Sequence, residues 1–218
     1  MAIVVVGGHA RKIGKTSVVA GIISSLPQYD WTAIKITQDD HTPSSASNGP
    51  RDCGTAATGF SVMEEHGDSS GTDSARYLQA GASRSFFVRA QPGRLAGAMP
   101  RIREELARAG NAILESNSIL RFLGPDLALM VLDFRVADFK PSAQHFLDRA
   151  DAVLLAPAIS TPGPAWPATL LHQIENRPQF PIGPPSYVSG PLVAFVRQRL
   201  TSPRQEIYIR TAHDRPSK

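Results

Sequence analysis

The sequence has one cysteine, no long apolar run and only a small excess of charge, and each absence excludes a class of protein. Cys53 is the single cysteine among 218 residues, which excludes an intrachain disulfide and is typical of a reducing compartment. His66, His145 and His172 show no metal-ligand spacing with one another or with this cysteine, so we expect ordinary roles for them. No segment is apolar enough to cross a membrane and no signal peptide is recognisable, so we expect a cytoplasmic protein without a membrane partner.

The charge balance favours small anionic ligands over nucleic acid. The formal net charge is +4, and the lysines and arginines are scattered instead of forming one basic patch. No aromatic and basic stacking surface is recognisable, so nucleic acid is not an expected partner. Trp31 and Trp166 stand near strand and proline-rich segments, where aromatic side chains usually serve packing.

Short apolar runs alternate with helical segments along the chain. AIVVV at residues 2–6 is rich in β-branched residues and is typical of a strand buried on both faces of a parallel sheet. Similar patterns predict strands at 31–37, 85–88, 111–116, 127–133, 151–157 and 206–210, and helices at 16–26, 72–81, 93–109, 142–150 and 190–200. The alternation predicts one α/β domain over residues 1–218, with a doubly wound, mainly parallel sheet and helices on both faces.

Two segments of the chain lack a clear period. Residues 38–71 are rich in Ser, Thr, Gly and Asp and predict a long polar loop, which in a compact domain is usually functional or disordered. Prolines cluster at about 157–191 and predict irregular connections there. We therefore expect no regular structure between the second strand and the helix that starts at Thr72.

The stretch GGHARKIGKTS at residues 7–17 contains most of a phosphate-binding loop. Gly14, Lys15 and Thr16 supply the Gly-Lys-Thr half, whereas His9 occupies the position of the first glycine and Gly8 comes one residue too early. The stretch follows a predicted strand and opens a predicted helix, so backbone N–H groups and the helix dipole would face a phosphate. Lys15 would bridge the β- and γ-phosphates, and the Thr16 hydroxyl would reach Mg²⁺. The extra residue would bulge within HARKI.

The predicted nucleotide-binding residues of this stretch are Gly8, Arg11, Lys12, Ile13, Gly14, Lys15, Thr16 and Ser17. A plain turn into a helix, with no phosphate bound, is the alternative for so short a motif. The flanking strand and helix favour phosphate binding over that alternative.

Acidic residues close two of the predicted strands. Glu115 and Asp133 come at the ends of NAILES and LALMVLD. Ligands of open α/β sheets collect at the carboxyl ends of strands, so both acids are placed to meet a nucleotide, although each could instead be a charge facing solvent. Asp39, with Asp40 and His41, follows the strand at 31–37 and could bind Mg²⁺ or substrate, or be an ordinary loop residue. The predicted catalytic residues are Lys15, Glu115 and Asp133, and the predicted metal ligands are Thr16, Glu115 and Asp39.

The order of these motifs resembles the molybdopterin-guanine dinucleotide biosynthesis protein B family, the MobB-like GTP-binding proteins. The similarity runs through most of the chain, in IGKTS, AIKIT, GTDSARYLQAGASRSFFV, ILES, LALMVLDF, DAVLLAPA and GPLVAFVRQRL. The segment with Asp-Ser and Ala-Gly-Ala is the most specific, since the phosphate loop alone selects only the superfamily. Ile36 stands where the family has a His, and Ser116 stands where it has a Gly.

The resemblance implies a P-loop NTPase fold, Mg²⁺-dependent binding of GTP or ATP, and a role in molybdenum cofactor synthesis. It implies that Lys15 and Thr16 bind nucleotide and Mg²⁺, that Glu115 belongs to the second nucleotide motif, and that Asp73 lies near the nucleotide. Without the resemblance, Asp73 is explained as a first-turn acid stabilised by the helix dipole. A cofactor-biosynthesis partner and a homodimer are also implied. The sequence has no Asn-Lys-x-Asp segment for reading guanine, so the choice of base stays open.

Three functions fit these observations. The first is a nucleotide-binding accessory protein that hydrolyses its nucleotide slowly, with positioning and electrostatics carrying the catalysis. The second is a small-molecule kinase or ligase whose substrate lies under the 38–71 loop and contacts Asp39, Asp40 or Lys35. The third is a non-catalytic binding module in which the loop is a structural relic.

Overall fold

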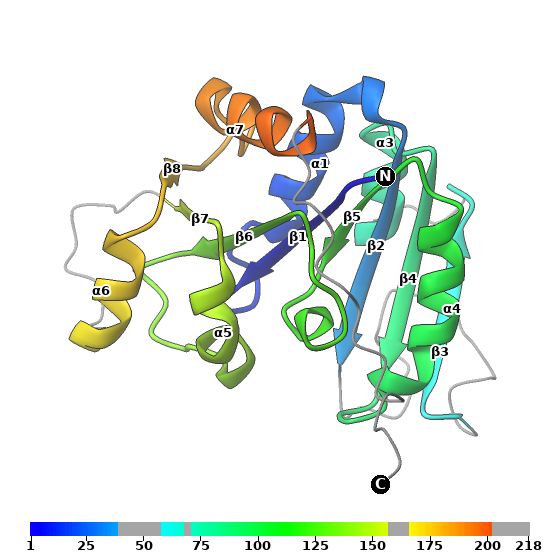
Figure 1. Cartoon of the computed structure of the whole chain (residues 1–218), viewed down its shortest axis with the longest axis horizontal. Coiled ribbons are helices and arrows are strands. Elements are labelled where there is room, and N and C mark those ends of the chain that lie inside the picture. Colours follow the sequence, from blue (N-terminus) through cyan, green and yellow to red (C-terminus); the bar gives the residue numbers. More distant parts are fainter. Residues whose placement is uncertain (39–57, 68–70, 157–165, 202–218) are drawn as a thin grey trace, which may run out of the picture.

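A mainly parallel sheet of eight strands forms the centre of the molecule. The computed structural model describes residues 1–38, 58–67, 71–156 and 166–201. Within them the strand order is β3-β4-β2-β5-β1-β6-β7-β8, from the right to the left of Figure 1. All pairings are parallel except that of β3 with β4. The strands are β1 (Ile3–Gly8), β2 (Trp31–Gln38), β3 (Phe60–Glu65), β4 (Arg84–Ala90), β5 (Asn111–Glu115), β6 (Leu127–Leu132), β7 (Ala152–Leu155) and β8 (Gln179–Pro181).

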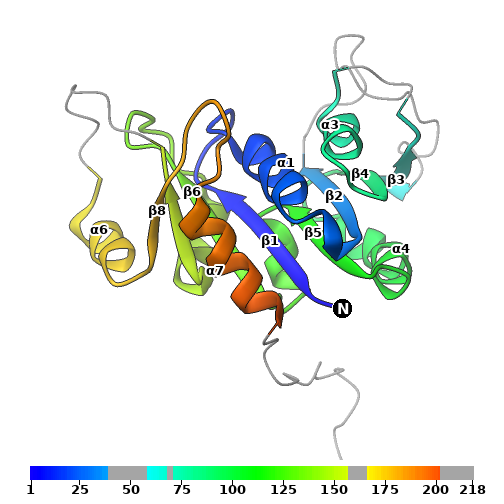
Figure 2. The ribbon, with the colours of Figure 1, turned by 90° about the horizontal axis from the view of Figure 1, so that it is seen from above.

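Helices cover both faces of this sheet. On one face α1, α3 and α7 pack, and on the other face α4, α5 and α6; α1 and α4 lie on opposite sides of the strands in Figure 2. The α-helices are α1 (Lys15–Ser25), α3 (Asp73–Gln79), α4 (Leu95–Ala107), α5 (Pro141–Phe146), α6 (Ala168–Glu175) and α7 (Gly190–Thr201). Three single 3-10 turns, η1 (Pro27–Tyr29), η2 (Ser118–Arg121) and η3 (Leu147–Arg149), join other elements. The predicted doubly wound α/β fold is therefore confirmed. None of the described helices has the length and apolar character needed to cross a membrane.

The first strand shows why the apolar runs of the sequence predict the sheet correctly. Val4 and Val6 pack into the core beneath α1 and α7, whereas Val5 packs into the core beneath α4. Each of the three is at most 1% exposed. A strand with helices on both faces must be apolar at every position, which is the pattern of AIVVV.

Two regions contain more regular structure than the sequence predicts. Residues 60–65 of the predicted polar loop at 38–71 form β3, an antiparallel edge strand on β4. Its sequence, FSVMEE, ends in two acids that apolar periodicity does not predict, and the second, Glu65, is buried and accepts hydrogen bonds from the Thr72 and Ser74 hydroxyls. The proline-rich segment at 157–191 contains α6 and β8, so the prediction of irregular structure is wrong for residues 168–175 and 179–181. The predicted strand at 206–210 lies outside the described residues.

The sheet order determines which loops meet at its carboxyl edge. β1 lies between β5 and β6, and β5 lies between β1 and β2. Glu115 is in register with Val6 on one side and with Lys35 on the other. The loop after β1 therefore has the end of β5 on one side and the end of β6 on the other.

Candidate functional site

The backbone between β1 and α1 forms a tight loop at the carboxyl edge of the sheet. Residues 9–14 cross from the end of β1 to Lys15, the first residue of α1. Gly14 has φ +95° and Lys12 has φ +57°, so both lie in the left-handed region, which Lys12 adopts without being a glycine. The amino end of α1 has no side-chain cap. Because the first N–H groups of a helix lack intrahelical partners, this end of α1 is suited to an anion.

Lys15 folds back across the loop. Its Nζ donates a hydrogen bond to the Ala10 carbonyl oxygen at 2.6 Å. A Cβ on Gly8 would lie 2.7 Å from Cδ of Lys15, so the glycine leaves room for the lysine side chain. Burial lowers the pKa of Lys15 to about 8, opposed by the charge of Glu115 and reinforced by Lys35. The ammonium group is thus poorly solvated and would gain from a nearby negative charge.

The loop is anchored in the core near both of its ends. His9, its first residue, is fully buried, and Ile13, near its end, is 4% exposed. The His9 ring packs against an aromatic cluster at centroid distances of 5.2 Å to Phe139 and 5.0 Å to Trp166. Burial lowers the pKa of His9. The residue at the position of the first glycine is therefore a neutral core residue.

Backbone hydrogen bonds hold His9 at the start of the loop, and two cations lie on the outside of the loop. The His9 N–H donates to the Val131 carbonyl oxygen at 3.2 Å, and its own carbonyl oxygen accepts from the Lys140 N–H at 2.8 Å. Arg11 and Lys12 are exposed on the outside of the loop. Cations at this position would meet an approaching phosphate.

Glu115 is the centre of a buried polar cluster beside α1. It is 2% exposed, and its Oε2 accepts a hydrogen bond from the Thr16 hydroxyl at 2.9 Å. The Tyr77 hydroxyl donates to the same oxygen, and Lys35 forms an ion pair with Oε1. The buried carboxylate is therefore satisfied by one cation and two hydroxyl groups from three different elements, as a buried charge requires.

Helix α3 adds two more polar side chains to this side of the loop. Thr72 caps the helix by accepting from the Ala75 N–H at 3.0 Å, which positions Asp73 in the first turn. Asp73 pairs with Lys35 at 2.9 Å and is 39% exposed. Arg76 donates to the Ser17 hydroxyl at 3.3 Å. The structure thus brings the predicted Thr16, Ser17, Asp73 and Glu115 together.

Asp133 lies on the opposite side of the loop. Its carboxylate accepts from the Arg135 side chain at 2.6 and 2.8 Å and from the Arg135 backbone N–H at 3.0 Å. These hydrogen bonds hold the pKa of Asp133 below its usual value. Among the described residues, none of the hydrogen bonds or ion pairs of Asp133 involves the Glu115 cluster. Asp39, the third predicted acid, lies outside the described residues.

Tyr77 is a site residue that the sequence pattern does not predict, and the pattern suggests Lys35 only as a substrate contact. Tyr77 follows Asp73 by four residues on one helix, a spacing that puts both on the same face. An aromatic residue at that spacing from a candidate acid was an available signal. Its tie to Glu115, however, depends on how α3 packs against β5 and α1, which the sequence pattern does not specify.

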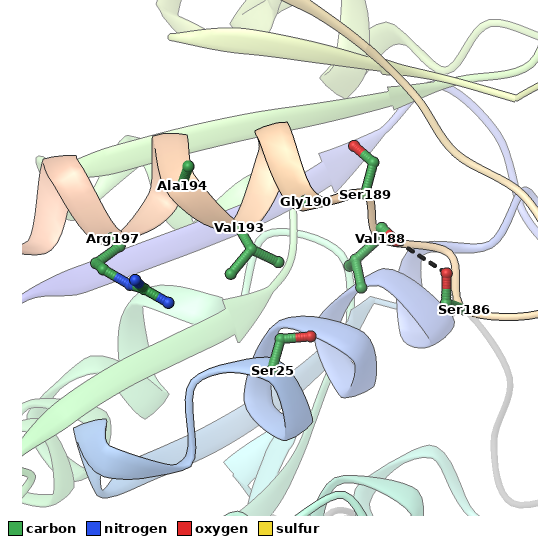
Figure 3. A pocket seen from close by; sticks show the side chains of 8 residues that line it. All are labelled: Ser25, Ser186, Val188, Ser189, Gly190, Val193, Ala194 and Arg197. Atoms are coloured by element: carbon green, nitrogen blue, oxygen red, sulfur yellow. Dashed lines mark hydrogen bonds between the residues drawn. The ribbon is translucent and has the colours of Figure 1, made fainter.

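In the described part of the chain, neither a cluster of metal-ligating side chains nor the cavity between α1 and α7 coincides with the loop. Within the described ranges no group of three or more His, Cys, Asp or Glu side chains could hold a metal ion. A cavity of about 570 Å³ lies between α1 and α7 (Figure 3). Its walls come from the end of α1, the segment before α7, and α7 itself: Ser25, Ser186, Val188, Ser189, Gly190, Val193, Ala194 and Arg197.

Three features identify the fold. The sheet is mainly parallel, a Gly-Lys-Thr loop joins the central strand β1 to α1, and the neighbouring strand β5 ends in an acid. The chain has the α/β fold of P-loop NTPases. No protein-family model matches the chain, and no curated protein matches it. The fold-level similarities to solved structures are distant.

Three solved structures illustrate that similarity. LpxK from Aquifex aeolicus, in complex with ATP, aligns with a TM-score of 0.47 and 19% identity over 83% of this chain and 53% of its own. HypB from Helicobacter pylori, in complex with nickel, aligns with a TM-score of 0.47 and 14% identity over 91% and 85%. FlhF complexed with GMPPNP and Mg²⁺ aligns with a TM-score of 0.46 and 13% identity over 91% and 73%. The chain thus spans about half the length of the first of these proteins.

Proposed function

We propose that this protein binds a nucleoside triphosphate, GTP or ATP, together with Mg²⁺ at the loop between β1 and α1, and hydrolyses it slowly. The observation that carries the proposal is the hydrogen bond from the Thr16 hydroxyl to buried Glu115. It links the first turn of the phosphate-loop helix to an acid at the end of the neighbouring strand. Residues 1–218 would form one P-loop domain around this site.

The residues beside α1 fit a magnesium ion. Mg²⁺ keeps several waters and is usually held by one or two protein oxygens together with phosphates, so a site without a cluster of acids suits it. The Thr16 hydroxyl can donate to Glu115 and still offer a lone pair to a cation. A bound magnesium ion would neutralise charge on the phosphate oxygens. Glu115 would accept hydrogen bonds from the waters of that ion.

The other residues of the loop would position and neutralise the phosphates. The Lys15 ammonium group would exchange its hydrogen bond to the Ala10 carbonyl oxygen for phosphate oxygens, a change favoured by its poor solvation. N–H groups at the start of α1 would donate to the same oxygens. Gly8 would serve by leaving space for Lys15. Arg11 and Lys12, exposed at the outer side, would attract the ligand.

The resemblance to MobB-like proteins supports a finer proposal, an accessory role in molybdenum cofactor synthesis with GTP as the nucleotide. The segment GTDSARYLQAGA, on which that resemblance chiefly rests, includes α3, whose Asp73, Arg76 and Tyr77 lie at the site. A protein partner from cofactor synthesis and a homodimer would belong to this role.

A second candidate is phosphoryl transfer to a small molecule. The observation that favours it is the exposure of Asp73, 39% of whose side chain stays accessible beside Lys35 and the buried Glu115. An accessible carboxylate held at the edge of a phosphate site can accept the proton of an attacking hydroxyl group. Faster nucleotide turnover with an added metabolite would favour this candidate, and hydrolysis alone would favour the first.

A thermal-shift series tests nucleotide binding directly. We would measure unfolding with GTP, ATP and GDP, each with and without Mg²⁺, for the native protein, Lys15→Ala and Arg103→Ala. A ligand at 100 times its Kd adds about 2.7 kcal/mol to stability, which is readily detected. Arg103 is exposed on α4, on the other face of the sheet from α1. Arg103→Ala therefore removes one positive charge, as Lys15→Ala does, but far from the loop.

Two outcomes of this series decide the proposal. A Mg²⁺-dependent shift that Lys15→Ala abolishes and Arg103→Ala retains would support it. Equal responses of the two variants, or no shift with any nucleotide, would contradict it.

A further inference from the structure

The segment before α7 lies directly on the phosphate-loop helix. A Cβ on Gly21 would lie 2.9 Å from the Ser186 carbonyl oxygen and 2.9 Å from Cγ1 of Val188, so only a glycine in α1 allows so close an approach. Figure 3 shows Ser186 and Val188 beside α1, in the stretch that leads into α7. Tyr187 lies between these two residues and is therefore held against α1 by both neighbours.

Tyr187 reaches from this segment to the phosphate loop. A Cβ on Gly14 would lie 2.8 Å from Cε1 and 3.1 Å from Cδ1 of the Tyr187 ring, so one edge of the ring meets the last glycine of the loop. The side chain is only half-buried. The ring thus flanks the loop at the start of α1, and part of it faces outward.

The backbone of Tyr187 adopts a costly conformation to achieve this. Its φ is +55°, in the left-handed region that a bulky residue rarely occupies. Such strain persists where the surrounding structure enforces it, and it gathers at ligand clamps and active sites. Packing of a half-buried ring does not by itself require this conformation, because a ring can also be presented from ordinary extended or right-handed backbone.

The arrangement of the site indicates which part of a nucleotide would meet this ring. Thr16, Lys35 and Glu115 lie on the β5 side of the loop, where a metal ion and the terminal phosphates would be bound. The nucleoside end of the same ligand must then leave the loop elsewhere. Tyr187 comes from the segment after β8, on the opposite, β6 side of β1. The sequence also lacks an Asn-Lys-x-Asp motif, so recognition of the base needs another group.

We propose that Tyr187 forms a stacking surface for the nucleoside of the bound nucleotide, a subsite that accepts either purine base. The inference rests on the proposed function, since it requires a nucleotide in the loop. An aromatic ring stacks on any base because every base has a π face. The ring edge fixed by Gly14 keeps the side chain in one position, which lowers the entropy lost on binding.

The experiment separates the base from the phosphates. We would measure by calorimetry the affinities of GTP, ATP and inorganic tripolyphosphate, all with Mg²⁺, for the native protein, Tyr187→Phe, Tyr187→Leu and Tyr29→Ala. Tyr187→Leu keeps apolar bulk against α1 but removes the π face. Tyr29 is a half-buried tyrosine at the far end of α1 and serves as a control for loss of an aromatic residue.

The expected result is a loss that depends on the base. Tyr187→Leu should weaken GTP and ATP binding about tenfold, in line with the loss of one stacked base, and leave tripolyphosphate within about twofold. Tyr187→Phe and Tyr29→Ala should bind all three ligands with the affinities of the native protein.

Three results would overturn the subsite alone and leave the proposed function standing. An equal loss of all three ligands in Tyr187→Leu would mean that the ring only supports the loop. An equal gain in affinity for all three ligands would mean that the ring obstructs the phosphate loop. If the native protein bound tripolyphosphate as tightly as GTP and ATP, the subsite would not exist although the phosphate site did. Failure of all three ligands to bind the native protein would instead overturn the proposed function and the subsite with it.

Discussion

The two sides of the phosphate loop differ in chemistry although they flank the same backbone. The β5 side is a connected polar cluster, in which Glu115 receives Thr16, Tyr77 and Lys35 from three elements. The β6 side contains aromatic rings around His9 and the local ion pair of Asp133 with Arg135. In a connected cluster, removal of one side chain also weakens the hydrogen bonds of the others. In a local pair, the effect stays with the two partners. Glu115 and Asp133, equivalent in the sequence, should therefore respond differently to substitution.

The largest effect is expected for Glu115→Gln. The variant leaves Lys35 without its buried counter-charge and removes the acceptor for metal-bound water. We expect nucleotide turnover to fall about 10- to 100-fold. Stability should fall by about 3 kcal/mol, as for a broken buried pair. Steady-state hydrolysis and urea unfolding measure the two effects. Glu104→Gln, at an exposed glutamate of α4, is the control and should change neither.

The pH dependence of nucleotide affinity should report Lys15. Its pKa is lowered to about 8 in the free protein, and bound phosphates would raise it, so binding takes up a proton above this pH. Affinity should be constant below about pH 8 and then fall, approaching tenfold per pH unit. Lys15→Arg keeps its charge at these pH values and should give a flat profile. A native profile that is equally flat would contradict a role for Lys15 in binding.

The same lowered pKa predicts the sign of a stability change. The unfolded lysine titrates near its ordinary value, well above the folded value of about 8, so the unfolded chain binds more protons between the two. Stability of the free protein should therefore rise with pH across this window. Urea unfolding of the native protein and of Lys15→Met, which should lack this rise, measures it.

A smaller effect is expected for Tyr77→Phe, which keeps the ring but removes one donor to Glu115. A hydrogen bond to a buried charged group contributes about 1.5 kcal/mol or more, and Thr16 and Lys35 would still hold the carboxylate. The KM for Mg²⁺ should rise about fivefold to tenfold, whereas kcat at saturating Mg²⁺ should change less. An unchanged KM with a lower melting temperature would show that Tyr77 serves packing only.

The smallest effect is expected for Asp133→Asn. Asp133 is bonded to Arg135, whose side chain is 42% exposed, and exposed ion pairs contribute about 1 kcal/mol or less. Nucleotide turnover should stay within about threefold of the native value. A loss as large as that of Glu115→Gln would mean that both strand-end acids serve the metal, and the contrast between the two sides would be wrong.

Much of the scaffold could be predicted because its signals are local. AIVVV indicates a strand buried on both faces, and Gly14-Lys15-Thr16 after it indicates an anion site at a helix start. The position of Glu115 followed from the rule that the ends of parallel strands share one edge. β3, α6 and β8 were missed because short edge elements with polar or proline-rich sequences have weak periodicity.

What the sequence by itself determined is the alternation of the central strands with helices and the chemical character of the loop, since both depend on residues close together in the chain. Only the tertiary structure decided which acid meets Thr16, because Glu115 lies 99 residues further along the chain and Asp133 is similar to it in pattern. It also decided that His9 is a core residue and that Tyr187 touches Gly14. Such contacts follow from how the sheet order and the helix layers bring distant segments together, which no local pattern encodes.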